Sequence, residues 1–276
     1  MIQAWPAWRT HAQWNIDAPG LQRREAESLA RVEGLAQIGG HCGLCERDTS
    51  FLRIESAAPW REGLLCRHCR CNARQRAAAI VLLQALARPQ DAQIYATEQA
   101  SPFYVALKRR LKRVSGSEFV TGRWRRVRFS FWLLRHGVAE WIRNEDATSL
   151  RRPSGSLDGV VSLDVLEHIP DYAAALREFA RVLKPGGVLV MTLPFYEAQP
   201  DSATIARLDA QGRIEHLGEP EFHGDPVRGG VTCFHHFGWD LLAALRSAGF
   251  GDAVACRVQD PARGLPQGQW VLRAQR

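Results

Sequence analysis

The sequence predicts an α/β protein that contains a parallel β-sheet and, ahead of it, a small zinc-binding module. From Asp91 onward, short apolar runs alternate with helical segments, which is the pattern of a parallel sheet with crossover helices. Four cysteines stand in two Cys-x-x-Cys pairs early in the chain. The chain has 276 residues, 46% hydrophobic and 24% charged, so it can bury a sizeable core and is neither disordered nor fibrous.

Residues 1–40 are predicted to form an N-terminal helical extension, with a polar amphipathic helix over about 20–38. This segment has no charged start followed by an apolar block, so it does not read as a secretion signal. The longest apolar stretch, Ala77 to Ala87, includes Gln84 and is shorter than the roughly 20 residues of a membrane span. We therefore expect a cytoplasmic protein without a membrane partner.

Residues 41–73 are predicted to form a zinc-ribbon-like module around Cys42, Cys45, Cys66 and Cys69. Each Cys-x-x-Cys pair can turn two thiolates toward one ion, and the loop between the pairs can close the tetrahedron. A redox pair or free thiols are the alternatives, but two pairs at this spacing favour zinc. Because the protein would supply all four ligands, the zinc is expected to be structural.

Residues 74–276 contain the predicted α/β domain. We expect helices over 74–87, 103–114, 171–183 and 239–248, and strands over 93–97, 114–119, 158–163, 188–193, 252–258 and 269–274. Asp171 is the predicted cap of its helix, and the last two strands are expected to pair antiparallel. Residues 194–237 form a long connection with four of the nine histidines and several aromatic residues, which favours an ordered substrate lid.

Carboxylates follow the expected strands in an ordered series. The strand ends carry, in order, Glu98, Glu118, Asp146 and Asp164. Ligands of open α/β sheets bind at the carboxyl ends of the strands, where an acid can hold both hydroxyls of a ribose. Glu118 comes twenty residues after Glu98, which is the right distance for that role. Any one of these acids could be a solvated loop residue, but the ordered series favours a ribose-binding site.

Two motifs carry a family resemblance. The first is Asp158-Gly-Val-Val-Ser-Leu-Asp-Val-Leu-Glu-His-Ile-Pro-Asp-Tyr172, and the second is Leu176-Arg-Glu-Phe-Ala-Arg-Val-Leu-Lys-Pro-Gly-Gly-Val-Leu-Val190. They resemble class I S-adenosylmethionine-dependent methyltransferases of the methyltransferase type 11 kind, over roughly residues 90–260. The resemblance implies a Rossmann-like seven-stranded sheet with one antiparallel edge strand.

The whole chain, zinc module included, also resembles a bacterial branch of these enzymes. The motifs that suggest the branch are Pro59-Trp-Arg-Glu, Cys71-Asn-Ala-Arg, Thr97-Glu-Gln and Phe222-His-Gly-Asp-Pro.

The resemblance assigns the cofactor-binding positions. It implies that Glu118 binds the ribose hydroxyls of S-adenosylmethionine and that Asp146, with the backbone of Ala147, holds the adenine edge. Leu163 and Asp164 would flank the methionine portion, and Phe195 would face the substrate.

The chain departs from the family in the first loop. The family usually has a glycine-rich loop there, but Ala96-Thr-Glu-Gln-Ala-Ser-Pro102 has no glycine. Glycine lets the backbone approach the ligand closely, and side chains narrow that approach. Either Thr97, Glu98 and Gln99 contact the amino-acid end of the cofactor in a different way, with Glu98 facing the ammonium group, or the site does not bind it.

Histidines are the candidate bases for methyl transfer, which needs positioning and a proton acceptor for a hydroxyl or amine. We single out His168, His223 and His235, with His216 and His236 as further candidates from the same connection. An alternative uses Asp164, Glu167 and His168, which resemble the metal site of certain O-methyltransferases. With His235 or His236 they could hold Mg²⁺ or another divalent ion.

Three functions remain open at this stage. The leading one is a methyltransferase that acts on an O or N acceptor of a small-molecule or saccharide-type substrate. The second is an RNA methyltransferase, because the net charge is +7 and the runs 108–113 and 123–128 are rich in arginine. The third is a non-catalytic, zinc-dependent binding module with a degenerate methyltransferase fold. The sequence does not indicate an oligomeric state.

Overall fold

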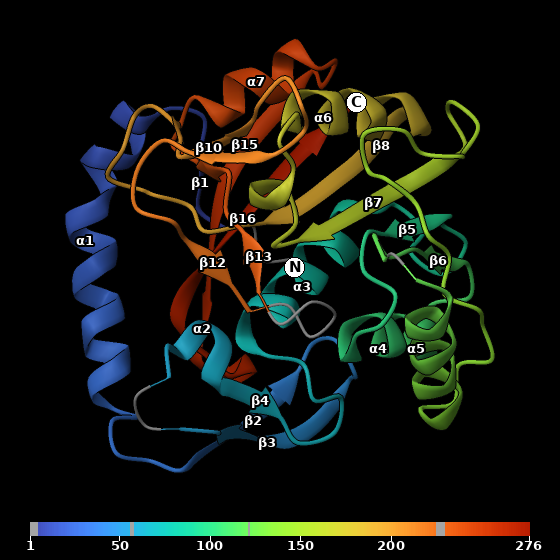
Figure 1. Ribbon diagram of the computed structural model, residues 1–276. Helices are drawn as coiled ribbons and strands as arrows, with labels where there is room; N and C mark the ends of the chain where they lie inside the picture. Colours follow the sequence, from blue (N-terminus) through green and yellow to red (C-terminus); the bar gives the residue numbers. More distant parts are fainter. Residues whose placement is uncertain (1–4, 56–57, 121, 225–229) are drawn as a thin grey trace.

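The computed structural model describes residues 5–55, 58–120, 122–224 and 230–276 and shows an α/β fold (Figure 1). A seven-stranded mixed sheet runs through it in the order β1-β15-β16-β8-β7-β5-β6. Its strands are β1 (Ala7–Trp8), β5 (Ile94–Ala96), β6 (Val114–Gly116), β7 (Leu157–Leu163), β8 (Leu183–Thr192), β15 (Asp252–Asp260) and β16 (Leu265–Gln275). The predicted Rossmann-like seven-stranded sheet is therefore confirmed.

Strands β5, β6, β7 and β8 run parallel, so their carboxyl ends meet at one end of the sheet. Ala96 pairs with both Gly116 and Val161 across these strands. Strand β16 runs antiparallel to β8 and β15, and β1 runs antiparallel to β15. The expectation of one antiparallel strand at an edge is wrong in this detail. Strand β16 lies inside the sheet, and the N-terminal β1 supplies an antiparallel edge.

Helices cover both faces of the sheet (Figure 1). Helices α3 (Ala73–Ala85) and α4 (Pro102–Arg110) belong to one hydrophobic core, and α6 (Tyr172–Val182) and α7 (Leu241–Ser247) belong to the other. Neighbouring strand residues alternate between the cores, because successive side chains of a strand point to opposite faces. Val161 packs in the first core and Val160 in the second. Asp171 caps α6 as predicted, since its carboxylate accepts from the Ala174 N–H at 2.9 Å.

Helix α1 (His11–Ala30) begins and ends earlier than the predicted range of about 20–38. Thr10 caps it, and the buried Trp14 and Ala18 lie before Pro19, where the sequence alone favours a start. Trp14 packs edge-on against Trp270 of β16, with ring centroids 4.8 Å apart. This packing extends the helix through Pro19. Among the described residues, no helix is long and apolar enough to cross a membrane.

The cysteine-rich segment forms a separate three-stranded sheet in the order β2-β3-β4, below the main sheet in Figure 1. Its elements are β2 (Gln37–Cys42), β3 (Arg47–Arg53), α2 (Trp60–Gly63) and β4 (Leu64–Cys66). The buried Arg76 of α3 ties this sheet to the main one. It donates to the carbonyls of Leu64 and Cys71 at 3.0 Å and of Gly264, between β15 and β16, at 2.6 Å.

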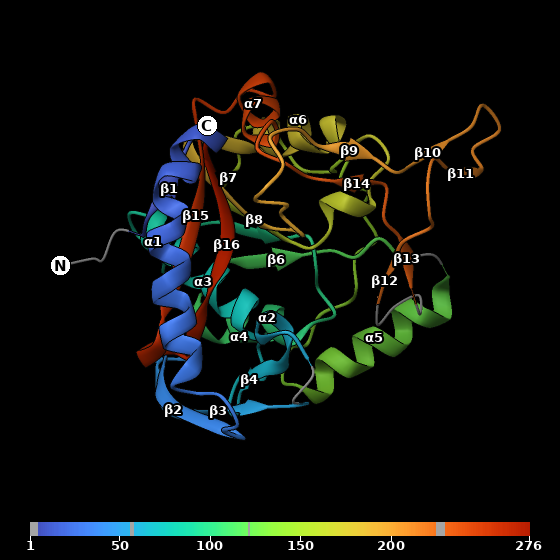
Figure 2. The ribbon, with the colours of Figure 1, turned by 90° about the vertical axis from the view of Figure 1, so that its left-hand side faces the viewer.

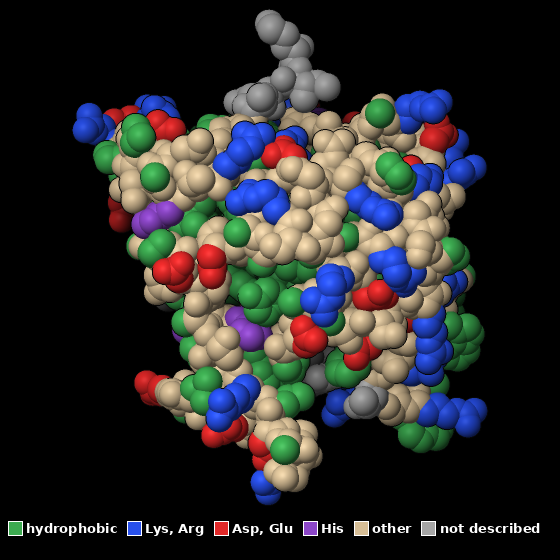
Figure 3. Space-filling model, turned by 90° about the horizontal axis from the view of Figure 1, so that it is seen from above, with side chains coloured by type: hydrophobic (Ala, Val, Ile, Leu, Met, Phe, Trp, Pro, Cys, Tyr) green, Lys and Arg blue, Asp and Glu red, His purple; other side chains and the backbone are tan. Residues whose placement is uncertain are grey.

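The connection 194–237 carries three short antiparallel ladders. Strand β9 (Ala203–Thr204) pairs with β14 (His235–His236), β10 (Ala206–Leu208) with β11 (Ile214–His216), and β12 (Phe222–His223) with β13 (Val231–Thr232). A parallel bridge between Phe195 and Phe237 closes its base. Seen from above in Figure 3, the molecule is notched along its lower edge, and hydrophobic side chains line the notch. Asp225 and Pro226 of the Phe222-His-Gly-Asp-Pro motif lie outside the described residues.

Candidate functional site

The acids predicted at the strand ends do converge. Thr97 and Glu98 follow β5, Glu118 lies just beyond β6, and Asp164 follows β7 directly. The charges of Glu118 and Asp164 both act on the carboxyl of Glu98. The parallel register of the three strands therefore builds one acidic site from residues that are far apart in the chain.

Glu118, which the resemblance assigns to the cofactor ribose, holds the glycine-free first loop in place. Oε1 of Glu118 accepts hydrogen bonds from the backbone N–H groups of Gln99 at 2.7 Å and Ala100 at 2.6 Å. The buried side chain of Gln99 donates to the carbonyl of Trp141 at 3.0 Å and accepts from the Arg143 N–H at 2.9 Å. Thr97 bonds Ser162 of β7 at 3.1 Å. Side-chain contacts therefore fix this loop, which is rich in glycine in the family that the sequence resembles.

One of the two carboxylate oxygens of Glu98 has no hydrogen-bond partner within the described part of the chain. Its Oε1 is buried and makes no hydrogen bond to any described residue. Burial raises the pKa of Glu98 to about 7, although the positive charge of Arg74 acts in the opposite direction. An unpartnered carboxylate oxygen of this kind is suited to a cationic ligand group, because buried polar atoms are costly without a partner.

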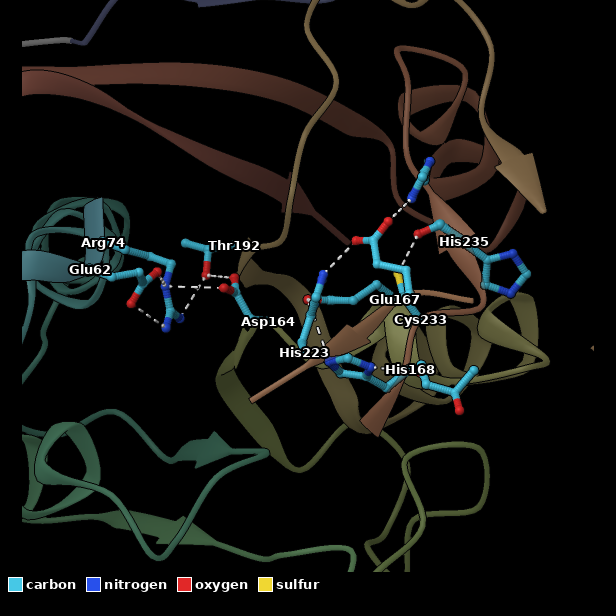
Figure 4. Close-up of polar contacts among 12 residues, drawn as sticks. Glu62, Arg74, Asp164, Glu167, His168, Thr192, His223, Cys233 and His235 are labelled. Carbon is cyan, nitrogen blue, oxygen red and sulfur yellow. Dashed lines mark hydrogen bonds and ion pairs between the residues drawn. The ribbon is translucent and has the colours of Figure 1, made fainter. Parts of the chain in front are cut away.

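Asp164 is neutralised by two arginines from outside the sheet, Arg61 and Arg74. Figure 4 shows the contact with Arg74. Its Oδ1 lies 2.6 Å from Arg61 of α2, and its Oδ2 lies 3.2 Å from Arg74 of α3. Thr192, at the end of β8, donates to the same carboxylate at 2.9 Å. Burial would raise the pKa of Asp164, but the charges of Arg74 and Arg61 hold it below its ordinary value.

Glu62 and Asn72 hold these arginines in place. Glu62 lies 2.9 Å from both Arg61 and Arg74, and it also accepts a hydrogen bond from Asn72. The sequence interpretation missed Arg61, Glu62 and Arg74 as site residues. A signal was present, because these residues are part of the Pro59-Trp-Arg-Glu and Cys71-Asn-Ala-Arg motifs. They contact the strand ends only through the tertiary fold.

The remaining predicted cofactor positions line the same end of the sheet. Asn144 makes a parallel bridge to Glu118, so the segment that leads to Asp146 runs beside β6. Asp146 is exposed, and its Oδ1 accepts from the N–H and the hydroxyl of Thr148 at 2.8 and 2.7 Å. Ala147 packs against the second core and Leu163 is buried. Phe195, predicted to face the substrate, packs edge-on against Trp239 and Trp270 at 5.2 and 5.3 Å.

A second cluster forms around the fully buried Glu167 (Figure 4). Its Oε1 lies 3.8 Å from Nε2 of His168 and 3.8 Å from Nδ1 of His223. Nδ1 of His168 is hydrogen-bonded to the carbonyl of Thr232 at 2.9 Å, and Nε2 of His223 to Glu221 at 2.8 Å. Burial raises the pKa of Glu167, whereas the nearby carboxylates of Glu167 and Glu221 raise the pKa of the His223 imidazole to about 9. The structure therefore unites His168 and His223, 55 positions apart, at one buried carboxylate.

His235 lies outside this cluster. Its Nε2 is 3.1 Å from the carbonyl of Pro170, its Nδ1 is 3.2 Å from the hydroxyl of Thr204, and burial lowers its pKa. His236 bonds Glu221 at 2.7 Å. The geometry favours His168 over His235 as the proton acceptor, because both ring nitrogens of His235 are already engaged. His223 is disfavoured as well, because its raised pKa keeps it protonated near neutral pH.

The magnesium site expected from Asp164, Glu167 and His168 is not assembled. Asp164 is bound by arginines, and its φ of 50° turns the chain before Glu167. Glu167 and His168 instead lie with His223 in a group whose ligand atoms are all within 4.8 Å of one another. Two imidazoles and one carboxylate suit a transition metal better than Mg²⁺.

The four predicted cysteine ligands meet in the N-terminal module. Their sulfurs all lie within 4.8 Å of one another, with Cys42 Sγ 3.9 Å from Cys69 Sγ and Cys45 Sγ 3.8 Å from Cys66 Sγ. Sulfurs bound tetrahedrally to zinc at about 2.3 Å are about 3.8 Å apart, so these spacings fit the ion.

The two Cys-x-x-Cys turns have the same backbone geometry. The N–H of Glu46 bonds the carbonyl of Cys42 at 2.8 Å, and the N–H of Arg70 bonds that of Cys66 at 2.9 Å. Glu46 and Arg70 both have positive φ, at 52° and 62°, which is uncommon for residues other than glycine. Two loops of unrelated sequence therefore adopt one knuckle conformation around the sulfurs.

Comparison with known families identifies the central segment. Residues 81–191, less than half of the chain, match the model of the methyltransferase domain family. The match runs from α3 to β8 and so includes the carboxyl ends of β5, β6 and β7. This segment matches the methyltransferase domain family, and the sheet around it has the Rossmann-like class I methyltransferase fold. The family resemblance noted in the sequence is confirmed.

Curated relatives match this chain over a small part of their own length. The 2-methyl-6-phytyl-1,4-hydroquinone methyltransferase of Synechocystis sp. is 47% identical over 47 residues, which are 17% of this chain and 15% of the relative. The sterol 24-C-methyltransferase erg6 of Aspergillus fumigatus is 31% identical over 114 residues, 40% of this chain and 29% of the relative. The chain thus matches less than a third of either relative. The structure of an S-adenosylmethionine-dependent methyltransferase from Mesorhizobium loti aligns with 72% of this chain and 98% of its own, at 20% identity and a TM-score of 0.48.

Proposed function

We propose that the protein transfers a methyl group from S-adenosylmethionine to an O or N acceptor on a small-molecule or saccharide-type substrate. The observation that carries the proposal is the convergence of Glu98, Arg74 and Glu118 at the carboxyl ends of the parallel strands. The cofactor would supply an electrophilic methyl group at its sulfonium. The chain's own residues would hold the cofactor, orient the acceptor and take up its proton.

The charges at the strand ends fit the amino-acid portion of the cofactor. The unpartnered Oε1 of Glu98 can accept from the ammonium group, and the guanidinium of Arg74 can donate to the carboxylate. Asp164 and Leu163 would flank this portion. Glu118 would bind the ribose, while Asp146 and the backbone of Ala147 would bind the adenine edge. Thr97 and Gln99 hold the loop between these groups.

Glu98 makes cofactor affinity depend on pH. With its pKa at about 7, its carboxyl loses a proton as the pH rises through neutrality and becomes able to pair with the ammonium group. We expect the affinity for S-adenosylhomocysteine to increase about tenfold from about pH 6 to about pH 8, and then to level off. Calorimetry across this range tests the rise. The Glu98→Gln variant should show a flat profile, and an equal rise in that variant would contradict this role.

The Glu167 cluster can take the acceptor's proton. A hydroxyl or amine loses one proton when its O or N bonds the methyl carbon, and the imidazole of His168 can accept it. His223, with its pKa at about 9, already carries a proton near neutral pH and adds positive charge beside Glu167. The buried Glu167 carboxylate stabilises the imidazolium that forms, as the buried acid of a catalytic triad does. His168 is oriented for this role because its other ring nitrogen is bonded to Thr232.

Replacing Glu167 with glutamine should lower the kcat of methyl transfer by about 10²- to 10⁴-fold, because the imidazoles lose their buried negative charge. The affinity for S-adenosylhomocysteine should not change. The control is Glu215→Gln, which removes an exposed acid of the same connection, paired only with Arg207 among described ion pairs. A wild-type rate in Glu167→Gln would exclude the proton role. A rate that needs added divalent metal would mean that the cluster holds a cation instead.

We further propose that Cys42, Cys45, Cys66 and Cys69 bind one structural Zn²⁺, supported by the tetrahedral sulfur spacing. Four thiolates give the centre a net negative charge, which the buried guanidinium of Arg76 partly balances. Burial lowers the pKa of Arg76, and the charges of the cysteines oppose that effect. Metal analysis of the purified chain should give one zinc per molecule.

The acceptor class can be tested with labelled cofactor. The protein is incubated with methyl-labelled S-adenosylmethionine and either a low-molecular-weight metabolite extract or total RNA. Label in the small-molecule fraction supports the proposal, whereas label in RNA, with binding that falls steeply with salt, would favour the RNA alternative. A protein that binds neither cofactor nor product would be a zinc-dependent binding module.

A further inference from the structure

Helix α5 (Arg123–Arg135) presents an apolar stripe to solvent. Trp124, Val127, Phe131 and Leu134 follow one another at intervals of three and four residues, so they share one face of the helix. Trp124 is 83% exposed, Phe131 56% and Leu134 57%. The opposite face, with Leu133, packs against the protein. A contiguous apolar face of this size on a surface helix is typical of an interaction site.

Arginines flank the stripe on both sides. The helix carries five arginines and no acidic residue. At 3.6 residues per turn, Arg123 projects on the flank of the stripe that Leu134 borders, while Arg128 and Arg135 project on the flank that Trp124 borders. The helix is held to the domain by other groups, because Arg126 donates to the carbonyl of Ile142 at 3.2 Å and Ser130 accepts from the Ile142 N–H at 3.0 Å. The exposed stripe and its flanking charges are not needed for this attachment.

We infer that α5 docks the protein onto the surface of a bilayer that contains anionic phospholipids. A helix with an apolar stripe and arginine flanks lies in the interface plane, with the stripe at the boundary of headgroups and acyl chains and the cations at lipid phosphates. Val127 and Leu134 favour lipid over RNA, because aliphatic side chains do not stack on bases. A second copy of the chain is disfavoured, since two helices with five arginines each would face one another.

The docking surface lies on the side of the candidate site. In Figure 2, α5 lies on the same side of the molecule as β12 and β13. The carboxyl end of β6 points toward that side. Phe222 of β12 is 61% exposed as well. Docking through α5 would therefore hold the open end of the sheet near the membrane surface. The inference does not depend on the proposed methyl transfer, because it concerns a helix that none of the proposed cofactor contacts involve.

Vesicle co-sedimentation of the full zinc-loaded chain tests the inference. Vesicles of phosphatidylcholine with phosphatidylglycerol should retain the protein, and pure phosphatidylcholine should retain much less. The double variant Trp124→Ala/Phe131→Ala should lose at least about tenfold in vesicle affinity. Each of Arg128→Gln and Arg135→Gln should lose about fivefold on the anionic vesicles. The matched control is Ile16→Ala, since Ile16 is 80% exposed on α1. Thermal unfolding should be unchanged in all of these variants.

Four results would overturn the inference. The first is no retention on anionic vesicles, and the second is retention that the double variant and Ile16→Ala weaken equally. The third is selective binding of a single-stranded RNA, and the fourth is a dimer in sedimentation velocity that the double variant dissociates. Selective RNA binding would assign the surface to nucleic acid, and the dimer would assign it to a second copy.

Discussion

Replacing Cys45 with serine will lower the affinity for S-adenosylhomocysteine by at least about tenfold, although Cys45 does not lie at the strand ends. Structural zinc contributes on the order of 10 kcal/mol of folding free energy, so loss of one ligand lets its module unfold. The segment between the two cysteine pairs carries α2, whose Arg61 lies 2.6 Å from Asp164. Without this segment, Asp164 and Arg74 lose the partners that fix them beside the cofactor position.

Two variants distinguish the effect of unfolding the zinc module from the effect of losing the contact between Arg61 and Asp164. Cys71→Ala is the matched control, because Cys71 is buried in the same module but stands outside the sulfur quartet. It should retain zinc and wild-type affinity. Arg61→Ala should retain zinc and still lose affinity, since it removes the contacts with Asp164 and Glu62 but no sulfur ligand. Wild-type affinity in a zinc-free Cys45→Ser protein would show that the module does not support the site.

Replacing Arg74 with methionine will weaken S-adenosylhomocysteine binding by on the order of 10²-fold or more. Arg74 is 12% exposed in its side chain and neutralises Asp164 and Glu62. Its pKa is raised by these carboxylates, against the effect of burial. Removing one member of a buried charge network leaves the other charges uncompensated, which costs about 3–5 kcal/mol. In the proposed site it also removes the donor to the cofactor carboxylate. Arg74→Lys keeps the charge and should recover part of the affinity.

A ligand that lacks the amino-acid portion of the cofactor tests whether Arg74 binds the cofactor carboxylate or acts only through folding. Methylthioadenosine has the adenine and ribose of the cofactor but neither the ammonium nor the carboxylate group. Its affinity, measured by calorimetry, should be nearly the same in wild type and Arg74→Met. If both ligands weaken equally, Arg74 acts through folding alone and does not face the carboxylate.

The parallel strands and the acids at their carboxyl ends could be predicted from the sequence for a physical reason. Buried strands and their crossover helices have different hydrophobic periods, and the carboxyl ends of parallel strands must meet. Glu98, Glu118 and Asp164 therefore come together as expected. Strand β1 could not be predicted, because Ala7–Trp8 is too short to show any period. The start of α1 was misplaced because Pro19 is typical of a helix boundary, and burial of Trp14 overrides that preference here.

The site was only partly predictable because side chains from outside the parallel strands complete it. They come from α2, from α3 and from the long connection 194–237. Arg61 and Arg74 lie outside the strand–helix alternation, and nothing local in the sequence indicates that they contact Asp164. The spacing of Asp164, Glu167 and His168 suggested a shared metal. The left-handed backbone at Asp164 and its two arginines instead place that acid with Arg61 and Arg74, in the proposed cofactor site. Glu167 acquires its partner His223 only through the long connection.

The most direct test of the account is a calorimetric titration of S-adenosylhomocysteine into the zinc-loaded full chain. We expect one site with a dissociation constant on the order of micromolar, roughly 8 kcal/mol of binding free energy, and we expect Arg74→Met and Glu118→Ala both to weaken it. Absence of binding across about pH 6 to pH 8, the range in which Glu98 ionises, would contradict it. The glycine-free loop would then not form a cofactor site, and the methyltransferase fold of this chain would serve another purpose.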